Sequence, residues 1–248
     1  MGQALVKDWK LQVLIGLLGL ALVFVLNRSG MDIALSMHFY DVGSASFPLR
    51  DEYLYSEVLH TGLKNFSVLI WLILFLACGF MFVMTRMGRS SKLVLSGALI
   101  SVLNYILVSS FVCASWVAWL KSQSAHSCPW DLTPFGGEFD FFYLGADWSL
   151  LGLESGPGKC FPSGHASVGW MWVGVLLVPS PAEGAARRFM VCLKLAVIAI
   201  SLTVSLTQIV RGAHFVSHVL MTAVICWGVA VLVYQLRPWL FKTGIQAS

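Results

Sequence analysis

Charged residues are scarce in this sequence. Asp, Glu, Lys and Arg make up 11% of the 248 residues, whereas hydrophobic residues make up 58%. A soluble globular protein of this composition would have too little polar surface to cover itself, so we expect an integral membrane protein. The formal net charge of +4 is small and does not indicate a protein that binds nucleic acid.

Internal repeats, low-complexity tracts and long polar linkers are also absent from the sequence, which predicts a single membrane domain over residues 1–248. A transmembrane helix needs about 20 mostly apolar residues. Six segments approach this requirement, so the sequence predicts an all-α, six-span transmembrane helical bundle. The predicted spans are 11–27, 66–85, 93–120, 164–180, 189–210 and 217–236.

Lysine and arginine are distributed unequally between the two predicted membrane faces. Nine lie on the face that carries both termini: Lys7, Lys10, Arg86, Arg89, Lys92, Arg187, Arg188, Arg237 and Lys242. Six lie on the opposite face: Arg28, Arg50, Lys64, Lys121, Lys159 and Arg211. Because cytoplasmic loops carry the excess of positive charge, this distribution predicts that both termini are cytoplasmic.

Three polar stretches fall on the predicted outer face. They are the region around Lys121, the segment CFPSGHAS at 160–167 and the segment RGAHFVSH at 211–218. Ionisable groups beside a span are costly, so their clustering indicates a functional site. Simpler roles remain open for three of these residues: Ser163 as a helix cap, Lys121 as an interfacial lysine and His218 as a packing residue.

The first outer segment contains EYLYSEVLHTGLKNF, residues 52–66. This stretch is compatible with an amphipathic helix lying at the membrane interface, and equally with a solvated loop.

The three polar stretches together resemble the signature of the type 2 phosphatidic acid phosphatase superfamily, which also includes the vanadium haloperoxidases. The first part is Lys121 followed by CP at 128–129, the second is PSGH at 162–165, and the third is His214 with His218 four residues later. The resemblance covers about 93–236. It implies a membrane enzyme with its active site at the outer face of the bundle.

The resemblance also implies a role for each matching residue. His214 would be the nucleophile that forms a phosphohistidine, and His165 would be the acid that protonates the leaving oxygen. Lys121, the Ser163 hydroxyl and the Gly164 backbone N–H would bind the phosphoryl oxygens. Such fixed donors suit the charge that spreads over these oxygens in the transition state. No metal and no cofactor are implied.

Three positions depart from the family pattern. Cys128 and Gln208 stand where the family usually has arginine, and His218 stands where it has aspartate. We expect Arg211 to supply a missing phosphate contact, because its guanidinium is long enough to reach the same phosphate. We expect His218 to orient His214 as a hydrogen-bond acceptor, with Asp131 as an alternative orienting carboxylate.

Cysteines follow the predicted topology. Four of them lie within spans, at Cys78, Cys113, Cys192 and Cys226, and are expected to pack as small apolar residues. Cys128 and Cys160 share the second outer loop, where a disulfide is the expected use and two free thiols are the alternative. The sequence has no closely spaced set of Cys and His of the kind that binds zinc.

These observations predict a lipid phosphatase of the bacterial inner membrane with its active site facing the periplasm. A membrane-embedded scaffold suits a substrate that is itself a lipid phosphate or diphosphate, such as phosphatidic acid, phosphatidylglycerol phosphate, an isoprenoid diphosphate or lipid A. Two alternatives stay open. One is a phosphotransferase that passes the phosphoryl group to a lipid acceptor, and the other is a catalytically silent relative that binds lipid.

Overall fold

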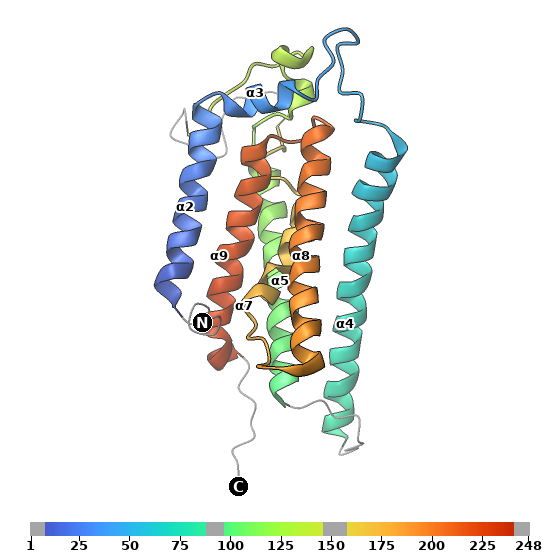
Figure 1. The fold of residues 1–248 in the computed structure, drawn as a ribbon, viewed down its shortest axis with the longest axis vertical. Helices are drawn as coiled ribbons and strands as arrows, with labels where there is room; N and C mark the ends of the chain where they lie inside the picture. The colour runs from blue at the N-terminus through green and yellow to red at the C-terminus, as the bar shows by residue number, and fades with distance from the viewer. Residues whose placement is uncertain (1–7, 88–96, 146–157, 241–248) are drawn as a thin grey trace.

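The computed structural model describes residues 8–87, 97–145 and 158–240, and these residues form helices and no named strand. Five long helices run side by side along the molecule (Figure 1). They are α2 (Trp9–Arg28), α4 (Leu63–Arg86), α5 (Gly97–Gln123), α8 (Gly184–Val210) and α9 (Val216–Leu240). Each contains a stretch that is long and apolar enough to cross a membrane, which fits a multi-pass membrane protein.

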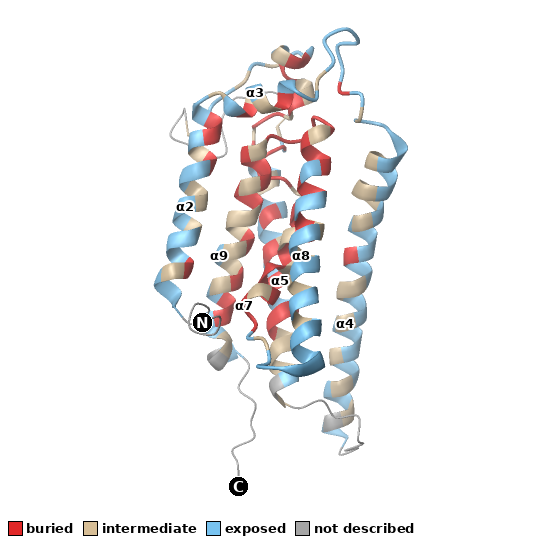
Figure 2. Ribbon diagram, viewed as in Figure 1, coloured by how far each residue is buried: buried red, intermediate tan, exposed pale blue. Residues whose placement is uncertain are grey.

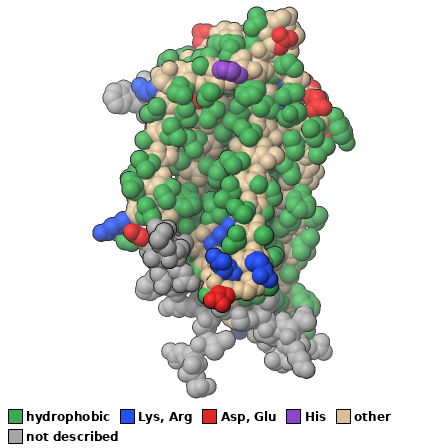
Figure 3. Space-filling view, viewed as in Figure 1, with side chains coloured by type: hydrophobic (Ala, Val, Ile, Leu, Met, Phe, Trp, Pro, Cys, Tyr) green, Lys and Arg blue, Asp and Glu red, His purple; other side chains and the backbone are tan. Residues whose placement is uncertain are grey.

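The five helices differ in how much of their surface they bury. α9 packs against both α2 and α5. Buried residues gather along α5 and α9, whereas α2 and α4 are largely exposed (Figure 2). The exposed side chains of α4 include Leu72, Ile73 and Phe80. Hydrophobic side chains also cover much of the face seen in Figure 3. In water such an apolar surface would promote aggregation, but it suits contact with lipid.

The predicted span at 164–180 is shorter than expected. The structure forms a broken helix of α6 (Ser167–Trp170), η4 (Met171–Val173) and α7 (Gly174–Leu177), about 16 Å long at 1.5 Å per residue. Its start is delayed because a turn precedes it, and it ends before Pro179 and Pro181, which cannot continue a helix. The Lys194 ammonium donates a 2.7 Å hydrogen bond to the carbonyl of Val178 at this end.

The short broken helix lies inside the bundle and contacts protein on most sides. Gly169 approaches α8 so closely that an added Cβ would lie 2.6 Å from the Cα of Ser201. The buried Tyr105 hydroxyl of α5 lies 3.2 Å from the carbonyl oxygens of both Gly174 and Ala230. These contacts join α5, α8 and α9 through the short helix, so it serves as the centre of the bundle.

One end of the bundle carries the short helices. They are α3 (Met31–Met37), the π-helix η1 (Leu54–Gly62), and the 3-10 turns η2 (Pro129–Asp131) and η3 (Thr133–Phe135). The fully buried Asp32 of α3 accepts hydrogen bonds from the backbone N–H and the hydroxyl of Ser217 at the start of α9. This carboxylate therefore fixes where α9 begins, as an N-terminal cap would.

The stretch 52–66 forms neither a separate interfacial helix nor a loop. η1 begins at Leu54 and runs directly into α4, so the two form one long element. η1 also packs against α8. This contact brings a residue of the first outer segment to the end of α8.

The end of the bundle opposite these short helices is basic. Arg86 ends α4, Arg187 and Arg188 lie in the first turns of α8, and Arg237 lies near the end of α9. Lys and Arg side chains gather near this lower end in Figure 3. Lys7, Arg89, Lys92 and Lys242 lie outside the described residues.

Candidate active site

The three sequence motifs meet at the end of the bundle that carries α3 and η1. Lys121 lies in the last turn of α5, the Ser163–His165 turn precedes α6, and His214 lies between α8 and α9. The backbone N–H of Ser163 donates a 3.2 Å hydrogen bond to the carbonyl of His218. The Thr222 hydroxyl donates a 2.9 Å bond to the carbonyl of Ser163. These bonds hold the second motif against the third.

Lys121 packs directly over Gly164. A Cβ added to Gly164 would lie 3.1 Å from Cδ and 3.5 Å from Nζ of Lys121. A larger residue at position 164 would therefore push the ammonium away. The bare glycine leaves its backbone N–H and the lysine side chain accessible to the same small anion.

The Ser163 side chain is fully buried, and its hydroxyl oxygen accepts a 3.3 Å hydrogen bond from the backbone N–H of Ala166. This bond closes the turn that precedes α6, whereas the N-cap residue of α6 itself is Ala166 and has no side-chain cap bond. Because a hydroxyl can accept and donate at once, the Ser163 proton can still be donated to a ligand.

A tight turn presents His214 at the end of α8. The backbone N–H groups of Ala213 and His214 both donate to the carbonyl of Gln208, at 3.0 and 3.1 Å. Gly212 has a positive φ of 69°, and an added Cβ would lie 2.4 Å from the ring of Phe47. Glycine is therefore needed at position 212 for two reasons, conformation and space.

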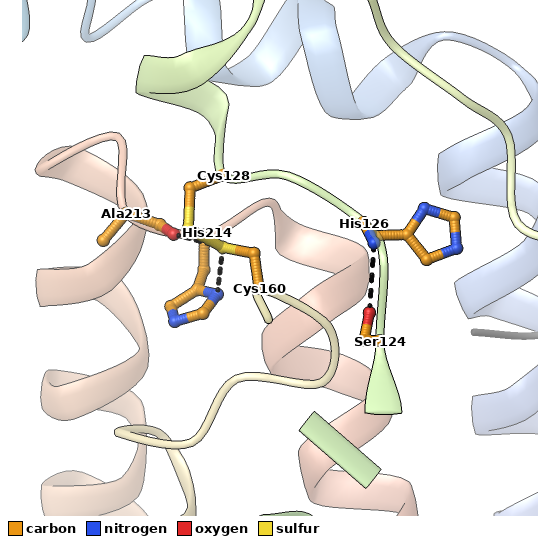
Figure 4. Close-up of a disulfide and its surroundings, with 6 residues drawn as sticks. All are labelled: Ser124, His126, Cys128, Cys160, Ala213 and His214. Atoms are coloured by element: carbon orange, nitrogen blue, oxygen red, sulfur yellow. Dashed lines mark hydrogen bonds between the residues drawn. A yellow bond between two sulfur atoms is a disulfide. The ribbon is translucent and has the colours of Figure 1, made fainter. Parts of the chain in front are cut away.

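The His214 imidazole contacts a disulfide (Figure 4). Cys128 and Cys160 are joined, with their Cα atoms 5.2 Å apart, and Nδ1 of His214 lies 3.3 Å from Sγ of Cys160. A disulfide sulfur carries no proton and can only accept, so this contact favours a proton on Nδ1. The tautomer leaves a lone pair on Nε2, the state that a nucleophile requires.

The same sulfur also lies 3.0 Å from the carbonyl oxygen of Ala213. Since neither atom carries a proton, this is a close contact without a donated hydrogen bond.

His214 is buried, with 3% of its surface exposed. Burial first, and then the nearby His218, Lys121 and His165, lower the pKa of His214 well below its ordinary value of 6.5. The imidazole is therefore neutral near pH 7, which preserves the Nε2 lone pair.

His218 occupies a different position from the one expected. Its ring centroid lies 5.9 Å from that of His214, and it meets Phe161 and Phe215 edge-on. Its Nδ1 is buried and has no hydrogen-bond partner among the described residues. The structure places Cys160 Sγ, and not His218, against Nδ1 of His214. The geometry thus favours the packing role for His218 over the orienting role.

Arg211 follows directly after α8 and is 8% exposed. Its Nε donates a 2.7 Å hydrogen bond to the carbonyl of Arg50, which fixes the guanidinium. Its Nη1 is buried, and no residue in the described part of the chain forms a hydrogen bond with it. A buried donor without a partner is costly, so this group is a candidate contact for an anion.

His165 lies at the same place and is half-buried. Burial, followed by His60, Lys121, Lys64 and Arg211, lowers the pKa of His165 to about 3. Every one of these neighbours is a base. A bound phosphate would counter their charges and raise the proton affinity of His165.

Two residues of this site, His60 and Gln208, lie outside the three sequence motifs. His60 of η1 stacks on His165 with ring centroids 3.7 Å apart, and its Nδ1 lies within hydrogen-bond distance of the Gln208 amide. Asp131, the predicted alternative orienting carboxylate, lies in η2. Burial raises its pKa, and the charge that acts on it is Arg50. It is not among the groups that act on His214.

Cys160, His214 and His218 bring their side-chain donor atoms within 4.8 Å of one another. A metal would need the thiolate of Cys160. The disulfide removes that ligand, so these three residues do not fit a metal site in this oxidation state.

Comparison with known proteins gives one match. The family model of the PAP2 superfamily matches residues 98–242, which is more than half of the chain and includes all three motifs. No curated protein and no solved structure matches the chain significantly.

Proposed function

The chain belongs to the PAP2 superfamily, a phosphatase family, and on this basis we propose that it is a membrane lipid phosphatase acting through a phosphohistidine at His214. The observation that carries the proposal is the convergence of Lys121, His165 and His214 at one end of an apolar bundle. Among the described residues, neither His165 nor His214 has a carboxylate partner, and such a site of bases suits an anionic headgroup.

The proposed first step breaks the bond between phosphorus and the lipid oxygen. Nε2 of His214 attacks phosphorus, and the bonding electrons of the ester leave with the oxygen, which takes the proton of His165. The Cys160 sulfur holds the Nδ1 proton in place throughout. Lys121, the Gly164 backbone N–H, the Ser163 hydroxyl and Nη1 of Arg211 would bind the phosphoryl oxygens and stabilise their charge.

The proposed second step releases phosphate. Water attacks the phosphohistidine and gives a proton to His165, while the electrons of the P–N bond return to Nε2 of His214. Both histidines then regain their starting protonation states. The overall reaction consumes one water and yields a lipid alcohol and inorganic phosphate.

An apolar cavity of about 400 Å³ supports a substrate with hydrocarbon tails. It lies between α4, α5, α8 and the short central helix, and Leu63, Trp172 and Ala196 are among its lining residues. Leu63 follows His60 by three residues, so the cavity begins close to the candidate site. Its polar lining groups bond each other: the Trp172 indole donates to the Ser67 hydroxyl at 2.7 Å. The cavity thus offers a hydrocarbon chain an apolar lining.

The membrane arrangement follows from charge. The candidate site lies at the end opposite Arg86, Arg187, Arg188 and Arg237. We propose that the basic end is cytoplasmic and that the site faces the periplasm of a bacterial inner membrane. The short helix within Ser167–Leu177, with its flanking turns, would then supply the sixth crossing.

The test is phosphate release by the purified, detergent-solubilised protein from a panel of lipid phosphates and diphosphates. The panel includes phosphatidic acid, phosphatidylglycerol phosphate, an isoprenoid diphosphate and lipid A, each assayed with and without a lipid acceptor. We expect release without an acceptor. Release that requires the acceptor would instead indicate a phosphotransferase, and neither release nor transfer would indicate a silent relative.

A further inference from the structure

His60 lies on the π-helix η1, outside every recognised motif, and yet its ring is part of the candidate site. Its centroid is 3.7 Å from that of His165, with 30° between the two ring planes. We propose that His60 is a positioning residue that holds the imidazole of His165 in the orientation needed to protonate the leaving oxygen. This inference rests on the proposed function of His165 as the acid.

The His60 ring is itself held by Gln208 on α8. Nδ1 of His60 lies 3.2 Å from Oε1 and 3.1 Å from Nε2 of the Gln208 amide, so either amide orientation gives a hydrogen bond. Gln208 is fully buried and carries no charge. It occupies the position where the family pattern has an arginine. The chain thus has a buried amide that binds a histidine from η1 where relatives have a cation.

Stacking restricts the His165 ring in a way that a hydrogen bond alone would not. Two nearly parallel rings at this separation fix the plane of the imidazole, while the ring edges stay available for proton transfer. His60, like Lys121, Lys64 and Arg211, lowers the pKa of His165, so the role proposed for His60 is to position the ring and not to stabilise its charge.

The local helix geometry places the ring. η1 is a π-helix of nine residues, and such segments are rare and frequent at functional sites. It packs against α8 and then continues as α4. The ring is therefore held between two long helices and not on a free loop.

Three substitutions of His60 distinguish the effect of its ring on His165 from the effect of its hydrogen bond to Gln208. His60→Phe keeps an aromatic face over His165 and loses the bond to Gln208. His60→Asn keeps a group that can bond Gln208 and loses the ring, and His60→Ala loses both. His38→Ala is the matched control, because His38 lies at the same end of the bundle, is exposed, and its ring bonds only the carbonyl of Ala34 among the described contacts.

We expect His60→Ala and His60→Asn to lower kcat by about 10- to 100-fold with little change in KM, since misplacing a reacting group by about 1 Å can cost this much. His60→Phe should retain kcat within about threefold of the wild type, and His38→Ala should be unchanged. Equal losses in the Phe and Ala variants, or full activity in the Ala variant, would overturn the proposal.

A second measurement does not require turnover. Diethyl pyrocarbonate labels neutral, accessible imidazoles, and peptide mass spectrometry reports the labelling rate of His165. Because the His60 ring covers one face of His165, labelling should rise severalfold in His60→Ala and His60→Asn but not in His60→Phe. Unchanged labelling in all variants would overturn the inference. If the wild type hydrolyses no lipid phosphate, the proposed function fails, while these labelling rates still decide the position of His60.

Discussion

The guanidinium of Arg211 donates one hydrogen bond to the protein through Nε. Its Nη1 is buried and has no hydrogen-bond partner among the described residues. Nε binds the Arg50 carbonyl at 2.7 Å, which aims Nη1 in a fixed direction. We predict that Arg211→Lys lowers kcat/KM by about 1 to 3 kcal/mol of transition-state stabilisation, because lysine keeps the charge but lacks the planar fork. Lipid phosphate hydrolysis checks this.

The control for this substitution is Arg28→Lys. Arg28 is exposed at the same end of the bundle, donates to the carbonyl of Leu144 and is not among the charges that act on His165 or His214. Equal rates for Arg211→Lys and the wild type would make Arg211 an interfacial anchor and remove it from the phosphate site.

Because His214 is buried and neutral, the stability of the folded protein should depend on pH. In the unfolded chain a histidine takes up a proton near pH 6.5, whereas the folded protein resists this at His214, whose pKa is lowered. The unfolded state therefore binds more protons below that pH, and stability falls as the pH drops.

The melting temperature in detergent should thus decrease from pH 8 to pH 5, and less steeply in His214→Gln. His38→Gln should keep the wild-type slope, since His38 is exposed. Parallel slopes for the wild type and His214→Gln would show that His214 titrates normally in the folded protein.

At the level of the helices, a larger side chain on α8 would fill part of the cavity between α4 and α8. Ala196 of α8 lines the cavity, whereas Ala199 of the same helix is exposed and does not line it. We predict that Ala196→Trp raises KM for a long-chain lipid phosphate several-fold and leaves a short-chain phosphate nearly unaffected, because only a long tail needs the filled volume.

Ala199→Trp should leave both KM values near those of the wild type. A Trp at 196 that affects short and long chains equally would contradict the cavity as a tail site and would indicate a general distortion of α8.

Helices of this protein could be predicted well from the sequence where lipid contact dictates their composition. Residues 11–27 and 189–210 lie within α2 and α8 because long apolar runs have few alternatives in a bilayer. The 164–180 span was predicted too long, because the Ser163 turn is fixed by bonds to His218 and Thr222, and no local pattern reports such bonds.

The candidate site was predictable only where a motif carried it. Lys121, the Ser163–His165 turn and His214 converge at one end of the bundle, and the sequence had predicted all three on one membrane face. His60 could not be predicted, since its contact with Gln208 joins residues 148 positions apart. The position of His218 relative to His214 could not be predicted for a similar reason. The disulfide brings Cys160 to His214, and a helical spacing does not indicate which atom lies nearest to a ring nitrogen.

At the scale of the whole molecule, the Cys128–Cys160 bond ties the first motif to the second and contacts the third. The two residues are 32 positions apart, so closing this loop is worth about 3 to 4 kcal/mol in the chain-entropy model. We predict that reduction, or the double change Cys128→Ala with Cys160→Ala, lowers the stability of the protein. It should also lower activity, because it disturbs the position of His214.

Thiol alkylation of membranes before and after reduction, followed by peptide mass spectrometry, tests the bond itself. Cys192 is an exposed free thiol within the span of α8, so in membranes dissolved in denaturing detergent it should be labelled in both samples, which makes it an internal control. Cys128 and Cys160 should be labelled only after reduction. Free labelling of both without reductant would mean that other contacts order this loop.

The central claim is that His214 carries the phosphoryl group. It is tested most directly by mixing purified protein with lipid phosphate labelled with radioactive phosphorus, quenching in alkali within a turnover and mapping the label by peptide analysis. We expect a transient, acid-labile label on the peptide that contains His214, and neither label nor phosphate release in His214→Ala. Release of phosphate by His214→Ala at a rate near that of the wild type would contradict it.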